Sequence, residues 1–255
     1  MSREPLLHLS NLRMVYEPYP LGVISPAFEP DLYAQLLRQF PPLDLFEFLP
    51  SHGNKYALSE RCHPKQYADF VSRNAVWREL HAYVKSAAFR FSVIEALRDR
   101  KIDLGIRRKS RTLGKHVLKL LKESARGHLP SIAAPIASRL EFSVLPASNG
   151  YLLPHTDSPG KLITLVVTMT RDGEWDRTWG GGTDVLKPKD PSNTYNYANR
   201  QIPYEQCEVL RTVEYVPNQA MLFIKTFNSL HGVKPMTGPE AIHRRTLTLN
   251  IEEGH

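Results

Sequence analysis

Residues 155–170 read HTDSPGKLITLVVTMT, a His-x-Asp pair followed by a run of apolar and β-branched residues. Such a run is typical of a buried β-strand. Residues two positions apart in a strand point to the same face, so His155 and Asp157 could hold one metal ion together. A third ligand would come from a distant segment. His231 is the best candidate, because it follows an apolar strand and precedes a turn at Gly232.

Four further segments follow this pair, and their order along the chain is informative. They are WGGGT at 179–183, VPNQAMLF at 216–223, HGV at 231–233 and RRTLT at 244–248. This order resembles the Fe(II)/2-oxoglutarate-dependent dioxygenases, specifically their prolyl-4-hydroxylase-like branch, over roughly residues 139–251. Two histidines and one carboxylate on one face of the metal also form the facial triad of non-haem Fe(II) oxygenases.

The resemblance implies a fold and a set of roles. The expected fold is a double-stranded β-helix (jelly-roll) core flanked by N-terminal helices. The resemblance implies that His155, Asp157 and His231 are the catalytic metal ligands for Fe(II), with 2-oxoglutarate and O₂ as cosubstrates. His243 is a rival third ligand, but it stands one residue before the basic pair at 244–245, too close for the family spacing.

The distal carboxylate of 2-oxoglutarate would need a fixed cation, a role that suits the planar fork of arginine. Alternation puts Arg244 on a polar face with three polar side chains, and Arg245 on the opposite, apolar face, so Arg244 is preferred. The strand after the metal pair offers Thr164 and Thr168 as further cosubstrate contacts. Leu145 stands where many relatives have a tyrosine that contacts the cosubstrate.

Helices early in the chain and short strands later predict an α+β protein of one domain, 1–255. Residues 1–135 would be mainly helical, and residues 136–255 would form the β-helix oxygenase core. The expected helices are 31–40, 75–97 with Asn74 as cap, and 113–122; the expected strands are 139–145, 161–170, 212–215, 220–225 and 245–251.

The composition, 42% hydrophobic and 23% charged over 255 residues, is that of an ordinary folded protein. The chain has no apolar run of about 18 residues, no secretory pattern at its start and two cysteines, so a cytoplasmic protein without a membrane span is expected. Residues 98–126 hold eleven basic and three acidic residues, a net charge of +8 against +7 for the whole chain. This basic segment would suit an anionic substrate, but it lacks the interleaved aromatic residues of a single-strand nucleic-acid site.

The resemblance implies a hydroxylase that acts on a C–H bond of a polar small molecule, sugar, glycan or peptidyl residue and releases succinate and CO₂. The long loop 187–208 is expected to meet the substrate through Tyr195, Asn196 and Tyr197. One alternative is a non-catalytic, cupin-like metal-binding module. Another is a nucleic-acid dealkylase, but those enzymes have a second arginine six residues after the first, where this chain has Asn250.

Overall fold

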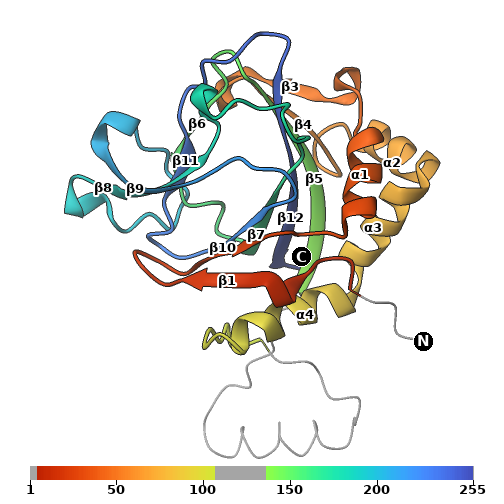
Figure 1. Cartoon of the computed structure of the whole chain (residues 1–255). Helices are drawn as coiled ribbons and strands as arrows, with labels where there is room; N and C mark the ends of the chain where they lie inside the picture. The colour runs from red at the N-terminus through yellow and green to blue at the C-terminus, as the bar shows by residue number, and fades with distance from the viewer. Residues whose placement is uncertain (1–4, 107–135, 255) are drawn as a thin grey trace, which may run out of the picture.

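The computed structural model describes residues 5–106 and 136–254, which form four α-helices and two antiparallel sheets (Figure 1). The larger sheet has the strand order β1-β2-β10-β7-β12-β5-β4-β3, and the smaller one has the order β6-β11-β8-β9. The strands of the C-terminal half are β5 (Ile136–Pro146), β6 (Leu152–His155), β7 (Lys161–Thr168), β8 (Thr183–Pro188), β9 (Cys207–Val213), β10 (Ala220–Ile224), β11 (His231–Val233) and β12 (His243–Glu253).

These eight consecutive strands form a jelly roll. β5, β12, β7 and β10 are neighbours in the larger sheet, and β6, β11, β8 and β9 make up the smaller one. The chain passes from one sheet to the other at each step except between β8 and β9, which pair with each other. Eight antiparallel strands divided in this way between two facing sheets are the jelly-roll arrangement. The predicted α+β fold with a double-stranded β-helix core and flanking N-terminal helices is therefore confirmed.

Four short strands that the sequence did not suggest widen the larger sheet at both edges. β1 (Leu12–Val15) and β2 (Leu21–Ile24) extend it beyond β10, and β3 (Glu47–Leu49) and β4 (Lys55–Ser59) extend it beyond β5. Each is five residues long or less; β2 and β4 pair with the distant strands β10 and β5, and β1 and β3 pair with β2 and β4, so pairing rather than a local pattern makes them strands.

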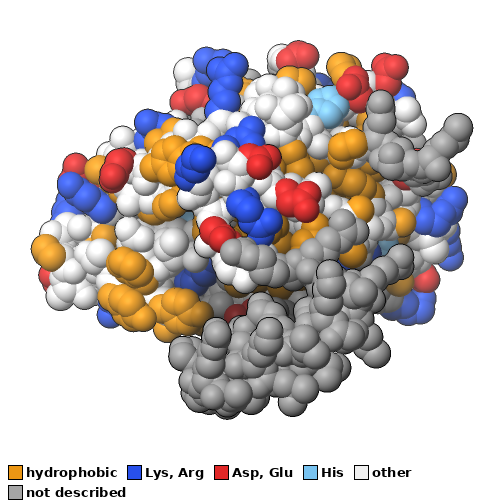
Figure 2. Space-filling model, turned by 90° about the horizontal axis from the view of Figure 1, so that it is seen from below, with side chains coloured by type: hydrophobic (Ala, Val, Ile, Leu, Met, Phe, Trp, Pro, Cys, Tyr) orange, Lys and Arg blue, Asp and Glu red, His pale blue; other side chains and the backbone are white. Residues whose placement is uncertain are grey.

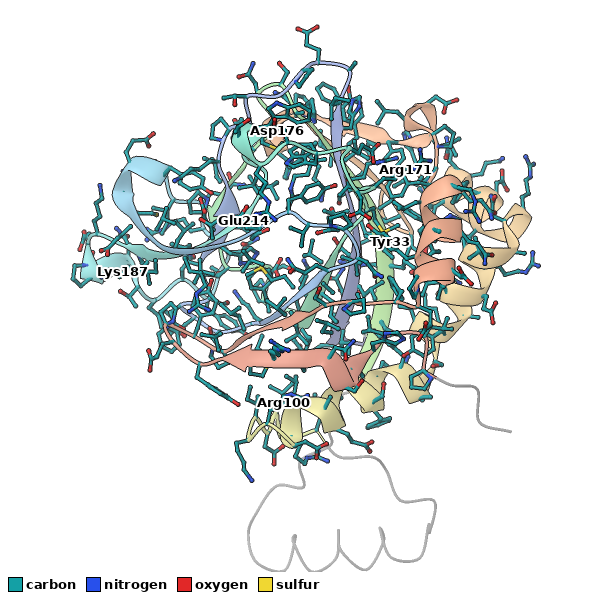
Figure 3. All side chains as sticks on the ribbon, viewed as in Figure 1. Tyr33, Arg100, Arg171, Asp176, Lys187 and Glu214 are labelled. Carbon is teal, nitrogen blue, oxygen red and sulfur yellow. The ribbon has the colours of Figure 1, made fainter. Side chains whose placement is uncertain are left out.

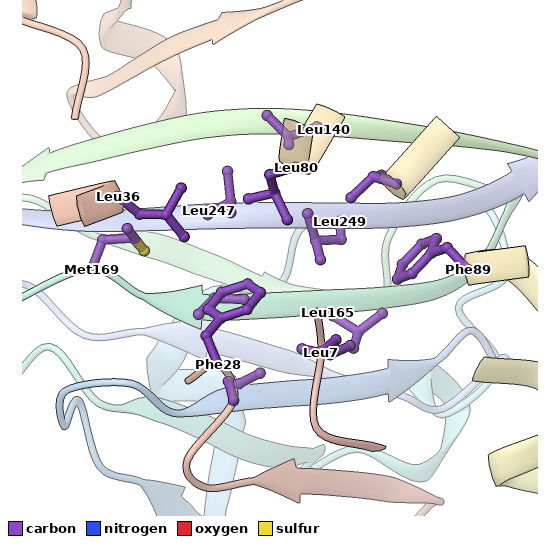
Figure 4. Packing of buried hydrophobic residues seen from close by; sticks show 14 of the residues in the cluster. Leu7, Phe28, Leu36, Leu80, Phe89, Leu140, Leu165, Met169, Leu247 and Leu249 are labelled. Atoms are coloured by element: carbon purple, nitrogen blue, oxygen red, sulfur yellow. The ribbon is translucent and has the colours of Figure 1, made fainter. Parts of the chain in front are cut away.

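The helices cover the outer face of the larger sheet (Figure 1). They are α1 (Pro30–Arg38), α2 (Pro64–Arg73), α3 (Ala75–Lys85) and α4 (Ala87–Arg98). Figure 4 shows how Leu80 of α3 and Phe89 of α4 meet Leu249 of β12 in one buried cluster. The Trp77 ring packs edge-on against Phe142 of β5 at 4.7 Å between centroids. The outward residues of the sheet thus form the main core, and its polar residues are left to face the smaller sheet.

The prediction of one helix over 75–97 is wrong. Ser86 has extended backbone angles, φ −75° and ψ 151°, and its side chain accepts a hydrogen bond from the backbone N–H of Phe89, so it ends α3 and caps α4. Asn74 holds the N-cap position of α3, but its side-chain amide donates to the carbonyl of Phe70 at 2.7 Å instead of capping the helix. Serine favours such caps because its hydroxyl replaces a missing backbone acceptor.

Most of the other expected strands are present, and some of them have different bounds. Strands appear at 139–145, 161–170, 220–225 and 245–251 within a few residues of the expected bounds, whereas the strand expected at 212–215 ends at Val213 and begins at Cys207. The expected helix 113–122 lies outside the described residues. No helix in the described residues is long and apolar enough to span a membrane.

The described start of the basic segment binds the chain itself. Arg98 donates to the carbonyl of Ile106 at 2.9 Å, and Arg100 donates to the carbonyls of Leu12 and Ala96, both at 2.9 Å. On the face seen in Figure 2, the coloured Lys and Arg side chains lie scattered among Asp and Glu rather than gathered. Among the described residues, the basic segment therefore forms internal contacts and gives no support to a role in substrate binding.

Candidate metal centre and its pocket

His155, Asp157 and His231 meet at one end of the jelly roll. The pairing of β6 with β11 puts His231 directly opposite His155, and the two ring centroids are 4.5 Å apart. One ligand atom from each of the three residues lies within 4.8 Å of the others. His155 and His231, 76 positions apart in the sequence, are therefore neighbours because β6 and β11 pair in the smaller sheet.

The local geometry differs from the one that the sequence suggested. β6 ends at His155, and Asp157 adopts a left-handed backbone with φ 70°, so the turn and not strand alternation aims its carboxylate at the histidines. Gly232 lies inside β11 rather than in a turn. A Cβ there would come within 2.9 Å of the Leu152 carbonyl, so the close approach of β6 requires glycine.

Two neighbours hold the Asp157 carboxylate. Lys161 Nζ lies 2.6 Å from Oδ1, and the Thr164 hydroxyl donates to Oδ2 at 3.0 Å. Burial opposes the charge of Asp157, but the Lys161 ammonium outweighs it, and the pKa of the carboxyl lies below its ordinary value. Asp157 is therefore ionised and ready to bind a cation.

Both imidazoles are oriented through their Nδ1 atoms. His155 Nδ1 lies 2.8 Å from the Leu153 carbonyl, and His231 Nδ1 lies 2.9 Å from the Ser229 carbonyl. A carbonyl accepts, so each Nδ1 carries the proton and each Nε2 keeps its lone pair. Burial lowers the pKa of His155 to about 3 and also lowers the pKa of His231. Two neutral imidazoles held by backbone carbonyls are the state in which histidine binds metals.

A buried arginine faces the triad across one cavity of about 100 Å³. Arg244 is only 5% exposed, and it donates from Nε to the Gly181 carbonyl at 2.6 Å and from Nη2 to the Thr183 hydroxyl at 3.3 Å. Its guanidinium also lies over the Tyr215 ring at 4.9 Å. No carboxylate among residues 5–106 and 136–254 forms an ion pair with it. A buried cation without a counter-charge is costly unless a ligand supplies the anion.

Arg245 points the opposite way, as the alternation of β12 predicts. It contacts both oxygens of Glu174, at 2.6 and 2.5 Å, and lies over the Phe40 ring at 5.7 Å. His243, the rival ligand, lies with Arg245 and Phe40 at a separate surface hollow. It is absent from the cluster of potential metal ligands in the described chain. Only Arg244 of the basic pair thus lines the triad's cavity.

The other residues considered for cosubstrate contacts lie at different parts of the pocket. Thr164 lines the cavity but hydrogen-bonds Asp157 and Asn250, at 3.0 and 3.2 Å. Thr168 borders a small neighbouring hollow that also reaches Arg244. Leu145 pairs with Arg244 in the sheet and gives the cavity an apolar wall.

The expected substrate residues lie outside this cavity. Tyr195 is 71% exposed and stacks on Phe227, and Asn196 is buried in bonds to the backbone of Arg200. Tyr197, 46% exposed, lines the same surface hollow as these two residues. Later residues of the same loop, Asn199 and Gln201, do border the hollow of about 230 Å³ that opens next to His155 and Asp157.

Several residues of the site gave no signal in the sequence. Lys55 of β4 and Glu141 of β5 line the cavity and form an ion pair at 2.7 Å, although 86 residues separate them. Lys225 donates to the carbonyls of Asp157 and Tyr197 at 2.8 and 3.0 Å. The four-residue spacing of Lys161 from Asp157 was the one local clue, whereas the others depend on contacts between distant strands.

No protein-family model and no curated protein matches this sequence. The structure is similar to a prolyl hydroxylase of Trichoplax adhaerens, solved with a peptide of the hypoxia inducible factor oxygen degradation domain (13% identity, 91% of this chain and 83% of that chain, TM-score 0.48). It is also similar to a prolyl 4-hydroxylase of Phytophthora capsici (16%, 92% and 59%, 0.49) and to one of Pseudomonas putida (12%, 92% and 92%, 0.45). All three are distant likenesses.

Proposed function

We propose that this protein is an Fe(II)- and 2-oxoglutarate-dependent oxygenase that hydroxylates a C–H bond of a polar substrate. One observation carries the proposal: the cavity that holds two neutral imidazoles and an ionised carboxylate at one end holds, at the other, a buried guanidinium with no carboxylate partner among the described residues. The first set fits a divalent iron with open coordination positions. The second fits the far carboxylate of a dicarboxylic keto acid.

Each residue has a defined task in this proposal. His155 and His231 would present Nε2, and Asp157 would present its carboxylate, to hold the metal. Arg244 would bind the distal carboxylate of 2-oxoglutarate. When bound, iron and its cosubstrates would supply the oxidising chemistry that converts the keto acid to succinate and CO₂ and hydroxylates the substrate. Apolar walls such as Leu145 and Phe223 would keep water from the reacting groups.

The prime substrate is proposed to enter through the hollow of about 230 Å³ that opens next to His155 and Asp157. Asn199 borders this opening, and its Oδ1 atom is buried and has no hydrogen-bond partner in the described chain. Turned toward the opening, this oxygen would accept a hydrogen bond from a hydroxyl or an amide N–H of the substrate, which favours a polar small molecule, sugar or peptidyl group. Tyr195 and Tyr197 are kept as outer contacts for a longer substrate.

The test is succinate formation from 2-oxoglutarate with Fe(II), ascorbate and O₂. We expect turnover in the wild type and none in His231→Ala. His243→Ala is the matched control and should keep its turnover, because His243 borders the hollow beside Arg245 and not the metal cavity. Metal binding without any succinate would instead indicate the cupin-like binding module. Full turnover in a folded His231→Ala protein would refute the ligand assignment.

A further inference from the structure

Two lysines stand at the mouth of the metal pocket. Lys55 belongs to β4 and Lys161 to β7. Both border the inner cavity that holds the triad and Arg244, and both border the outer hollow of about 230 Å³ beside His155 and Asp157. We propose that they bind an anionic group, a carboxylate or a phosphate ester, of the prime substrate. This inference rests on the proposed function and adds the substrate class to it.

The first support is the charge balance around Lys55. A row of ion pairs crosses the concave face of the larger sheet, with gaps of 2.7 Å for Lys55–Glu141, 2.7 Å for Arg139–Glu141, 3.6 Å for Arg139–Glu252 and 2.9 Å for Arg61–Glu252. Three cations share two carboxylates in this row, so one positive charge is in excess. Lys55 is the end of the row that borders the pocket, and its side chain remains 22% exposed.

The second support is the position of Lys161. Its ammonium lies 2.6 Å from Asp157 Oδ1, and its side chain is 17% exposed. Asp157 is the only carboxylate among the described residues that Lys161 pairs with. A divalent cation held by Asp157 would draw on the same carboxylate charge, so the ammonium would then favour a second anion. With the metal bound, Asp157 would no longer serve Lys161 alone, and a cleft focuses the remaining positive potential on an incoming anion.

The third support is the rest of the outer wall. Ser51, His52 and Ser158 line the hollow beside the lysines and can donate hydrogen bonds, and the hollow measures about 230 Å³. Hydroxyls and an imidazole placed around two ammonium groups suit the several oxygens of a carboxylate or a phosphate. Arg244 is reserved for the cosubstrate because it lines the inner cavity and not this outer hollow.

The experiment uses the full chain loaded with Mn(II) and 2-oxoglutarate under argon. Mn(II) and 2-oxoglutarate binding are measured first, by electron paramagnetic resonance and calorimetry. Inorganic phosphate and acetate are then titrated, and the broadening of their ³¹P and ¹³C resonances by Mn(II) reports binding close to the metal. Saturable phosphate binding alone would indicate a phosphate ester as the substrate group, and acetate binding alone would indicate a carboxylate.

Two variants of Lys55 and one control variant test this lysine. Lys55→Gln should weaken anion binding by about tenfold or more, since a charged hydrogen-bond partner is lost, and Lys55→Arg should retain it. Lys187→Gln is the matched control, because Lys187 lies at the outer end of the smaller sheet, away from the pocket (Figure 3), and should bind both anions as the wild type does.

Three outcomes overturn the inference. If Mn(II) and 2-oxoglutarate bind but neither anion does, or if Lys55→Gln binds the anions as well as Lys187→Gln, the lysines are merely structural and the proposed function stands. If Mn(II) or 2-oxoglutarate fails to bind, the proposed function falls, and the inference falls with it.

Discussion

Replacing Arg244 with methionine separates cosubstrate binding from folding. Its guanidinium is buried and has no carboxylate partner among the described residues, so bound 2-oxoglutarate would be its counter-charge. Truncating one partner of a buried, hydrogen-bonded charge pair costs about 2–5 kcal/mol, which is roughly thirtyfold to several-thousand-fold in Kd. We therefore expect Arg244→Met to raise the Kd of 2-oxoglutarate by at least about thirtyfold.

The free energy of unfolding of the ligand-free protein should respond quite differently. Arg244→Met loses the hydrogen bonds to Gly181 and Thr183, each worth about 1.5–3 kcal/mol, but it also removes a buried charge whose desolvation costs several kcal/mol. These terms offset each other, so stability should change little. Arg245→Met should instead lower stability by about 1 kcal/mol, because it breaks the partly buried pair with Glu174, whose side chains are 21% and 33% exposed.

Urea unfolding of the Mn(II)-loaded protein, with and without 2-oxoglutarate, measures both effects. A ligand at a hundred times its Kd stabilises the native state by about 2.7 kcal/mol, and a hundredfold rise in Kd reduces this to about 0.4 kcal/mol. The 2-oxoglutarate-induced stabilisation should therefore nearly vanish in Arg244→Met and persist in Arg245→Met. Equal stabilisation of the two variants, or loss in Arg245→Met alone, would refute the role given to Arg244.

Three further changes test the surroundings of the site. Asp157→Ala should abolish tight Mn(II) binding, measured by electron paramagnetic resonance, while near-ultraviolet circular dichroism stays native; retained binding would exclude Asp157 as a ligand. Burial opposes ionisation of Glu141, but Lys55 and Arg139 overcome this effect and hold the pKa of Glu141 well below its ordinary value of 4.5. The ionised Glu141 therefore contributes to stability above about pH 4.5, and this contribution is lost as the pH falls. The stability deficit of Glu141→Gln in urea should therefore be largest near pH 7 and shrink below about pH 4.5, and a deficit independent of pH would contradict this. Lys225→Met should weaken Mn(II) binding by about tenfold, because Lys225 anchors the Asp157 carbonyl, and an unchanged Mn(II) affinity would show that this anchor is dispensable.

Local periodicity in the sequence predicted individual helices and strands, whereas the jelly-roll core and the ligand roles came from the resemblance of the segment order to a known family. The alternation of β12 separates Arg244 from Arg245, and the structure has the same facing because one side of the strand packs under the helices. The His-x-Asp pair and His231 stand out by residue type, and their meeting depends on a pairing of β6 with β11 that the order of the segments suggests.

The features that could not be predicted depend on distant partners. β4 is a strand because it pairs with β5, whose residues lie more than 80 positions later, and this pairing brings Lys55 to Glu141. No pattern within residues 55–59 indicates either the strand or its role at the pocket. The break at Ser86 was missed because apolar spacing continues through it, whereas a single serine cap decides where α4 begins.

The backbone of Asp157 shows how the fold prepares the site. A left-handed conformation costs a non-glycine residue about 1–2 kcal/mol, although aspartate tolerates it better than most. Lys161 and Thr164 of β7 bind its carboxylate, and Lys225, just after β10, binds its carbonyl, so three side chains fix a position that the chain alone would avoid. Local strain that the surroundings hold in place is typical of functional sites. Because the carboxylate is already aimed at the two histidines, a metal ion would bind without paying to reorder this turn.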